Sequence, residues 1–209
     1  MEPDAVEIRV VGCLIEKQRT TPDVYPLTLN ALRLACNQAT NRDPVVDYDE
    51  NTIRGAIDRL VQRKWATLAS WSNRRSMKYR HTLDGALGLD DAEIALLDVL
   101  MLRGAQTPGE LKARTERLHR FADMDDLGGT LERLIERRLA VRLERRPGQR
   151  EERYTHLLGG EDMPEAAERA EPREAPASAD SFEQRFERLE QQIAELRTEL
   201  QALREQHSG

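Results

Sequence analysis

The chain carries two imperfect copies of one sequence pattern, and this repetition limits its possible folds more than any single motif. Segments match at separations of 74 to 75 residues and, further upstream, 86 residues: 59–66 with 133–140, 79–81 with 154–156, 7–8 with 93–94, and 21–22 with 107–108. We therefore expect two modules of one design. The change in separation places about twelve extra residues in the first copy, between Pro22 and Arg59, and the polar segment 37–48 is where we expect them.

Each copy predicts three helices followed by a β-hairpin. In the first copy we expect helices over residues 6–17, up to Cys36 and from Asp49 to near Trp65, with strands over 67–71 and 76–82. The second helix has two candidate starts, at Thr21-Pro22 or at residues 26–28. In the second copy we expect helices from residue 90 or 91 to 104, from Thr107 and over 127–139, then strands over 141–145 and 153–157.

Three helices and a hairpin are typical of the winged helix, a helix-turn-helix with an appended strand pair. The predicted fold is mainly α with small β-hairpins, built from winged-helix modules at residues 1–86 and 87–158. Residues 159–180 are acidic and rich in proline, which predicts a disordered linker. Residues 181–206 predict a coiled-coil helix.

The predicted coil has an unbroken heptad seam, formed by Phe182, Phe186, Leu189, Ile193, Leu196, Leu200 and Leu203. The isoleucine and leucine positions, together with attractive charge pairs beside the seam, favour a parallel homodimer. The alternative is an amphipathic helix that packs on the body of the protein or on a partner.

Composition excludes several classes of protein. No apolar run approaches 18 residues and no basic, apolar leader is present, so we expect a cytoplasmic protein without a membrane span. Cys13 and Cys36 have no metal-ligand companions, and we expect a buried, reduced pair. Phosphate-binding glycine loops, nucleophile elbows and HExxH motifs are absent from the sequence, which predicts neither an enzyme nor a metal or cofactor site.

Charge is distributed unevenly along the chain. Residues 159–209 hold 13 acids and 6 bases, whereas residues 54–80 hold eight bases and only one acid, Asp58. A winged helix lays its third helix in the major groove and its wing on the DNA backbone. The residues expected to bind nucleic acid are therefore Asn51, Arg54, Arg59, Gln62, Arg74, Arg75, Lys78 and Arg80. The matching helix of the second copy turns outward Asp125, Gly129, Glu132, Arg133 and Glu136, a face that disfavours DNA. The second copy is therefore expected to be a spacer or a protein-binding module.

Residues 12–18, 20–23, 25–32, 35–38 and 41–45 together resemble the YceH-like family of uncharacterised bacterial proteins. The resemblance implies a tandem winged-helix body and supplies no activity. Ala39 stands where a lysine is usual in that family, which disfavours anion binding by this loop. The loop is still a candidate site for a partner or ligand through Asn37, Gln38, Asn41 and Arg42. Its asparagine and aspartate side chains are alternatively helix and turn caps.

Two functions are consistent with these patterns. The first is a winged-helix DNA-binding protein, regulatory or nucleoid-associated, that uses its first module and wing. The second is a non-catalytic adaptor whose winged helices bind proteins.

Overall fold

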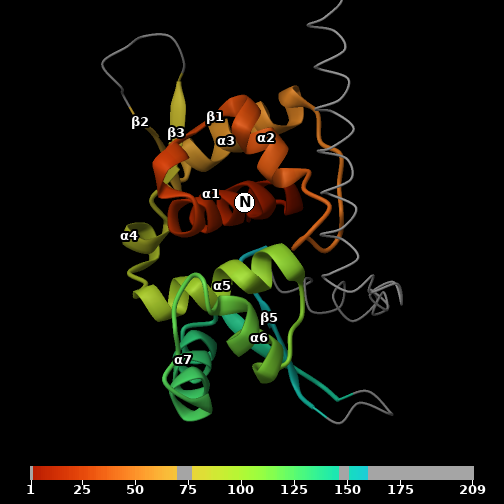
Figure 1. The fold of residues 1–209 in the computed structure, drawn as a ribbon, viewed down its shortest axis with the longest axis vertical. Coiled ribbons are helices and arrows are strands. Elements are labelled where there is room, and N and C mark those ends of the chain that lie inside the picture. Colours follow the sequence, from red (N-terminus) through yellow and green to blue (C-terminus); the bar gives the residue numbers. More distant parts are fainter. Residues whose placement is uncertain (1, 70–76, 146–150, 160–209) are drawn as a thin grey trace, which may run out of the picture. The chain divides into compact units, whose positions relative to one another are not determined.

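A computed structural model describes residues 2–69, 77–145 and 151–159, all of which lie in one contact unit spanning Met1–Arg169 (Figure 1). These residues are mainly helical, with small antiparallel sheets, as the sequence predicts. The predicted linker and coil, and the wing residues Arg74 and Arg75, lie outside the described residues. Within the described ranges, no helix has both the length and the apolar character needed to cross a membrane.

The repeats are named here from the sequence match: the first repeat is residues 1–86 and the second is residues 87–158. The first contains α1 (Ala5–Thr20), η1 (Pro22–Val24), β1 (Leu27–Thr28), α2 (Leu29–Cys36), α3 (Glu50–Gln62), β2 (Ala66–Ala69), β3 (Lys78–His81) and the start of α4 (Leu83–Leu87). The second contains α5 (Asp91–Arg103), α6 (Pro108–Thr115), α7 (Met124–Glu136), β4 (Ala140–Leu143) and β5 (Arg153–His156).

The helices begin where side chains satisfy their free backbone N–H groups. Reciprocal capping boxes start α1 (Asp4 with Glu7), α5 (Asp90 with Glu93) and α6 (Thr107 with Glu110). The last of these confirms the start predicted at Thr107. Thr28 caps α2, so the second helix begins at the later of its two candidate starts, and Pro22 opens the short 3-10 turn η1 instead.

The first sheet has the strand order β1-β3-β2, and both neighbouring pairs are antiparallel. The second repeat has the two-stranded sheet β4-β5. An isolated bridge between Gln106 and Tyr154 also joins the residues before α6 to β5. This bridge corresponds to the pairing of Leu27 with Tyr79 in the first sheet. The two repeats therefore share one strand arrangement.

The sequence suggested that the extra residues of the first repeat lie in the segment 37–48. The structure instead distributes them over α1 and two connections. Helix α1 is 16 residues long and α5 is 13, while α2 and α6 both have eight. The connection before α2 is four residues longer than that before α6, and the connection before α3 is five residues longer than that before α7. Capping and pairing align Thr107 with Thr28 rather than Thr21, which explains why the sequence match misplaced the difference.

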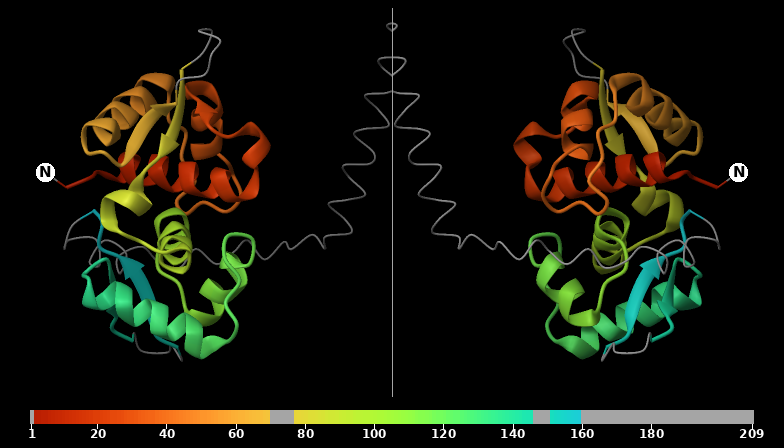
Figure 2. Two further views of the ribbon diagram at one scale, coloured as in Figure 1. Left: turned by 90° about the vertical axis from the view of Figure 1, so that its left-hand side faces the viewer. Right: turned by 90° about the vertical axis from the view of Figure 1, so that its right-hand side faces the viewer.

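The two repeats pack through α1 and α5, which cross one another at their junction (Figure 2). Both helices are buried on every side over long stretches, from Glu7 to Ile15 and from Glu93 to Leu102. Gly12 permits a close approach here, because a Cβ atom at this position would lie only 2.9 Å from Leu102 Cδ2. One continuous apolar core consequently runs through both repeats.

Candidate functional sites

Helix α3 presents an exposed polar face next to the hairpin of the first repeat. Asn51, Arg54, Asp58 and Gln62 are exposed, while Ile53, Ala56, Ile57 and Leu60 form the buried stripe. Arg54 pairs with Glu50 one turn earlier, at 2.6 Å, and both side chains remain about half exposed. An exposed pair of this kind contributes little stability, so the guanidinium can exchange its partner for a phosphate at small cost.

Arg59 differs from the other predicted contact residues because it is tied to α1. Its guanidinium binds Asp4 Oδ2 at 2.6 Å and Glu7 Oε2 at 3.2 Å, and Arg63 binds the other oxygen of Glu7 at 3.0 Å. Glu7 is almost completely buried. The arginines therefore neutralise a buried carboxylate. Arg59 still has 43% of its side chain exposed, so it also borders the outer face of α3.

The hairpin adds further cations to this side of the repeat. Arg80 is exposed on β3, and Lys78 is half-buried where β3 pairs with both β1 and β2. Arg80 also lines an open groove of about 640 Å³ with Arg63, Lys64 and Trp65. Of the eight residues predicted to bind nucleic acid, the structure describes six, and these lie on α3 and β3.

The equivalent helix of the second repeat carries the opposite charge. Asp125, Glu132 and Glu136 are exposed on α7, and Arg133 turns back to bind Asp90 and Glu93. Arg133 and Glu93 thus repeat the arrangement of Arg59 and Glu7. The two repeats therefore share the same structural ion pairs but differ in their outer faces. The face of α3 is polar and partly cationic, whereas that of α7 is acidic.

The loop between α2 and α3 has a structural role at each of its four candidate residues. Asn37 closes the loop, since its amide donates to Tyr48 O at 2.9 Å and its Oδ1 accepts from Tyr48 N at 2.9 Å. Asn41 has a left-handed backbone with φ of 61° and accepts a hydrogen bond from Arg103 Nη2 at 2.6 Å. The backbone N–H of Asp43 donates to Leu102 O at 2.9 Å. The loop therefore fastens the first repeat to α5 of the second.

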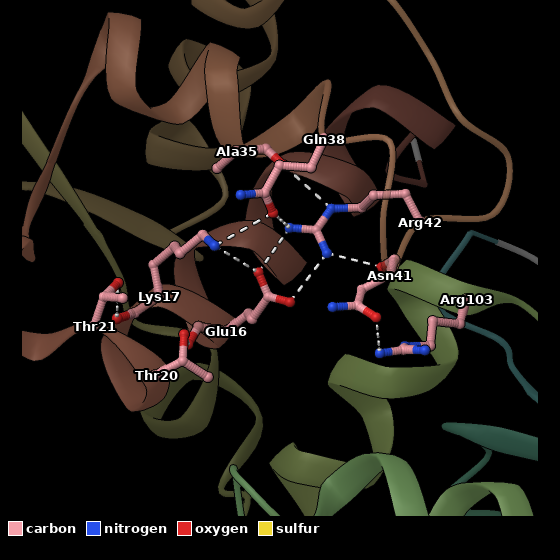
Figure 3. A network of polar contacts seen from close by, with 9 residues as sticks. All are labelled: Glu16, Lys17, Thr20, Thr21, Ala35, Gln38, Asn41, Arg42 and Arg103. Atoms are coloured by element: carbon pink, nitrogen blue, oxygen red, sulfur yellow. Dashed lines mark hydrogen bonds and ion pairs between the residues drawn. The ribbon is translucent and has the colours of Figure 1, made fainter. Parts of the chain in front are cut away.

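Arg42 lies at the centre of this loop with no exposed side-chain surface. Its guanidinium donates to both oxygens of Glu16, at 3.0 and 2.7 Å, and to the carbonyl oxygens of Ala35 and Asn41 (Figure 3). Gln38 Oε1 accepts from Arg42 and from Lys17. Burial favours the neutral carboxyl of Glu16, but the bonds and charge of Arg42 outweigh it and hold the pKa of Glu16 below its usual value.

Two further buried groups lie close to this network. Asp98 of α5 is 1% exposed, and its Oδ1 has no hydrogen-bond partner. Burial, followed by the nearby charge of Glu16, raises the pKa of Asp98 well above its ordinary value and so favours the protonated carboxyl. Cys13 and Cys36 are both buried and form no disulfide, as the sequence predicts for a reduced pair.

His81 and His156 occupy matching positions on β3 and β5 and are both buried. Burial lowers the pKa of each imidazole to about 4, so both are neutral near pH 7. His81 binds the side chain of Gln18, and its backbone N–H donates to Tyr25 Oη. Among the described residues, no group of three His, Cys, Asp or Glu side chains is placed to hold a metal ion.

Comparison with known proteins places this geometry in a family. The family model described as "Protein of unknown function, DUF480" matches residues 4–149. The chain belongs to the DUF480 family. It is 45% identical over 209 residues to the UPF0502 protein YceH of Escherichia fergusonii, covering 97% of this chain and 96% of that protein. It is 47% identical over 201 residues to a UPF0502 protein of Pelobacter propionicus, covering 95% and 91%.

The resemblance to the YceH-like proteins predicted from the sequence is therefore confirmed. The DUF480 match extends from α1 to β4, so both the α3 face and the junction between the repeats lie within the region shared with the family. The names of the family and of these relatives state no activity. Function has to be argued from the geometry of this chain.

Sequence reasoning identified α3 and the loop but missed the groups that α5 and α6 bring to the loop. Asp98 and Arg103 lie in a helix whose pattern is otherwise apolar, so periodicity predicts a core helix and no site there. One signal was available: an aspartate inside a helix whose neighbours on every side are apolar must be buried, and a buried carboxyl is an unusual and informative group.

Proposed function

We propose that the protein binds double-stranded DNA through its first repeat, with α3 in the major groove, and that each repeat is a winged helix. Two features support the winged-helix interpretation. The first repeat has the element order α1-β1-α2-α3-β2-β3 and the strand order β1-β3-β2. The second repeat follows the same plan, with the bridge from Gln106 to Tyr154 in place of a third strand. A winged helix of this order exposes its third helix for groove binding.

The observation that carries the DNA proposal is the exposed face of α3. Asparagine, glutamine and arginine form the bidentate contacts that read adenine and guanine edges, and Asn51, Arg54 and Gln62 lie on this face. Arg80 on β3 and Lys64 after α3 are exposed cations that suit backbone phosphates. Asp58 is the one acid on the face between Asn51 and Gln62, whereas α7 has three acids on its equivalent face.

Fluorescence anisotropy with a random-sequence duplex tests this proposal. The full chain should bind at low salt and weaken steeply as salt rises, because each phosphate contact releases a counterion. The double variant Arg54→Gln/Arg80→Gln should reduce the slope of log K against log salt by about one, through the lost phosphate contact of Arg80, and should lower the affinity further through the lost base contact of Arg54. The control Arg120→Gln/Arg142→Gln removes the same charge from exposed positions of the second repeat and should leave the slope unchanged.

An undetectable wild-type interaction at low salt would refute the proposal. Equal losses in the two double variants would also refute it, because binding would then follow net charge rather than the face of α3.

A second candidate function is protein binding by α7. Its exposed acids, together with the exposed side chain of Met124 at its first turn, form a surface that disfavours DNA and suits a basic partner. If the protein is an adaptor, the variant Arg54→Gln/Arg80→Gln would leave partner binding intact, whereas Glu132→Gln/Glu136→Gln would weaken it. Dimerisation through residues 181–206 remains a prediction, tested by light scattering on the full chain and on a chain ending at Gly160.

A further inference from the structure

A cavity of about 280 Å³ lies where α1, the loop after α2, α5 and α6 meet. Its polar lining comes from both repeats: Glu16 and Lys17 from α1, Asp98 and Arg103 from α5, Arg114 from α6, and Arg117 just beyond it. Figure 3 shows one wall, where Arg103 reaches Asn41 and Glu16 is held by Arg42 and Lys17. The volume suits a small metabolite and is too small for a nucleic-acid strand.

The cations around this cavity exceed the anions that neutralise them. Glu16 is already shared by Arg42 and Lys17, and burial favours the protonated form of Asp98, the other acid of the described lining. Among the residues that the structure describes, the Arg103 side chain has one hydrogen bond, to the uncharged Asn41, and its pKa is lowered by burial and then by the nearby charge of Arg114. Among the described residues Arg117 forms no ion pair, and Arg114 has one, with the partly exposed Glu110 at 3.3 Å. The charge of Arg114 is therefore unfavourable for that of Arg103, and an anion bound between them would relieve this repulsion.

Asp98 supplies a second, independent indication of a ligand. This carboxyl is 1% exposed, lines the cavity and has an oxygen with no hydrogen-bond partner. A buried polar group without a partner is costly, so such groups are few in folded proteins and often mark sites of function. Burial and then the charge of Glu16 favour the protonated form of Asp98, whose O–H donates to an oxygen of a bound anion rather than repelling it.

We propose that this cavity is a binding site for a phosphate group, held mainly by Arg103 and Arg117 with Asp98 and Lys17 beside it. Guanidinium forks bind phosphate oxygens in pairs, and a dianion neutralises two arginines at once. The cations come from α5, α6 and α1 rather than from the loop, so Ala39 does not weaken the site. A ligand here would contact both repeats and hold them together.

The test is the thermal unfolding of the full chain in inorganic phosphate at millimolar concentration, with chloride at equal ionic strength as the reference. Bound phosphate raises Tm in a way that follows the logarithm of ligand concentration. Arg117→Gln changes an exposed side chain and should fold normally, and it should weaken phosphate binding at least tenfold, as should Arg103→Gln. The matched control Arg120→Gln removes an arginine that is 83% exposed and outside this cavity, and should bind phosphate as the wild type does.

A second arm identifies the source of the phosphate group. Tighter binding of glycerol phosphate than of inorganic phosphate assigns the site to a phosphorylated metabolite, and equal or weaker binding assigns it to free phosphate. The proposal is overturned if phosphate gives no shift beyond chloride. It is also overturned if Arg103→Gln and Arg117→Gln respond to phosphate as Arg120→Gln does, because the shift would then reflect the general stabilising effect of phosphate salts.

Discussion

Replacing Gly12 by alanine tests whether the two repeats form one packed body. In most helices this change is favourable by about 1 kcal/mol, because alanine has the higher helix propensity. At Gly12 the new Cβ would lie 2.9 Å from Leu102 Cδ2 and 3.1 Å from Leu102 Cγ, in the interior of the α1–α5 contact. Overpacking of a core costs about 1–3 kcal/mol. We therefore expect Gly12→Ala to destabilise the protein by up to about 2 kcal/mol.

Urea unfolding followed by circular dichroism measures this effect in two backgrounds. Leu102→Ala alone should cost about 2–5 kcal/mol, since Leu102 is fully within the core. With the leucine side chain removed, Gly12→Ala should change sign and stabilise by about 1 kcal/mol. Gly129→Ala is the matched control, because a Cβ on this α7 glycine would meet no atom within 4 Å and should stabilise the protein in both backgrounds.

Two results would refute the reasoning. One is stabilisation by Gly12→Ala in the wild-type background equal to that by Gly129→Ala. The other is an unchanged effect of Gly12→Ala after Leu102 has been truncated, which would mean that the two side chains do not meet.

Three further predictions concern buried ionisable groups. Arg42→Met removes the bidentate partner of the largely buried Glu16 carboxylate and leaves it with Lys17 alone, so the free energy of unfolding should fall by about 3 kcal/mol. Arg54→Met should cost less than about 1 kcal/mol because that pair is exposed, and urea titrations compare the two variants. His156 has a pKa of about 4 in the folded protein and 6.5 in the unfolded chain. As pH falls from 6.5 to 4, the free energy of unfolding of the wild type should therefore fall by on the order of 3 kcal/mol relative to that of His156→Gln. An equal pH dependence in the two proteins contradicts this. The pKa of Asp98 is raised in the folded protein, so its contribution to stability is present below pH 3.8 and is lost as pH rises. Asp98→Asn should therefore become more stable relative to the wild type between pH 4 and pH 7, which urea unfolding of both proteins at the two pH values measures.

The sequence predicted the long helices well because their signals are local. Asp49 as N-cap and the apolar stripe from Ile53 to Leu60 define α3 without reference to the rest of the chain. The predicted end near Trp65 was too late, since the helix ends at Gln62 and Lys64 adopts a left-handed backbone with φ of 62°. Arg138 does the same after α7, so the repeated turn was hidden by residues that rarely adopt this conformation.

The elements that the sequence missed depend on distant parts of the chain. Strand β1 has only two residues and exists through its pairing with β3, about fifty residues later. The polar network around Arg42 could not be predicted either, because nothing in the sequence near Arg42 shows that α1 places Glu16 beside it. A surface such as the exposed face of α3 follows from periodicity, but a cavity formed by two repeats follows only from their packing.

The most direct test of the DNA proposal is a titration of the isotopically labelled full chain with duplex DNA, followed by backbone amide NMR signals at low salt. We predict that amides of α3 and β3 shift or broaden, that added salt reverses the change, and that amides of α7 stay unperturbed. Perturbation centred on α7, or an unchanged α3 at saturating duplex, would contradict it.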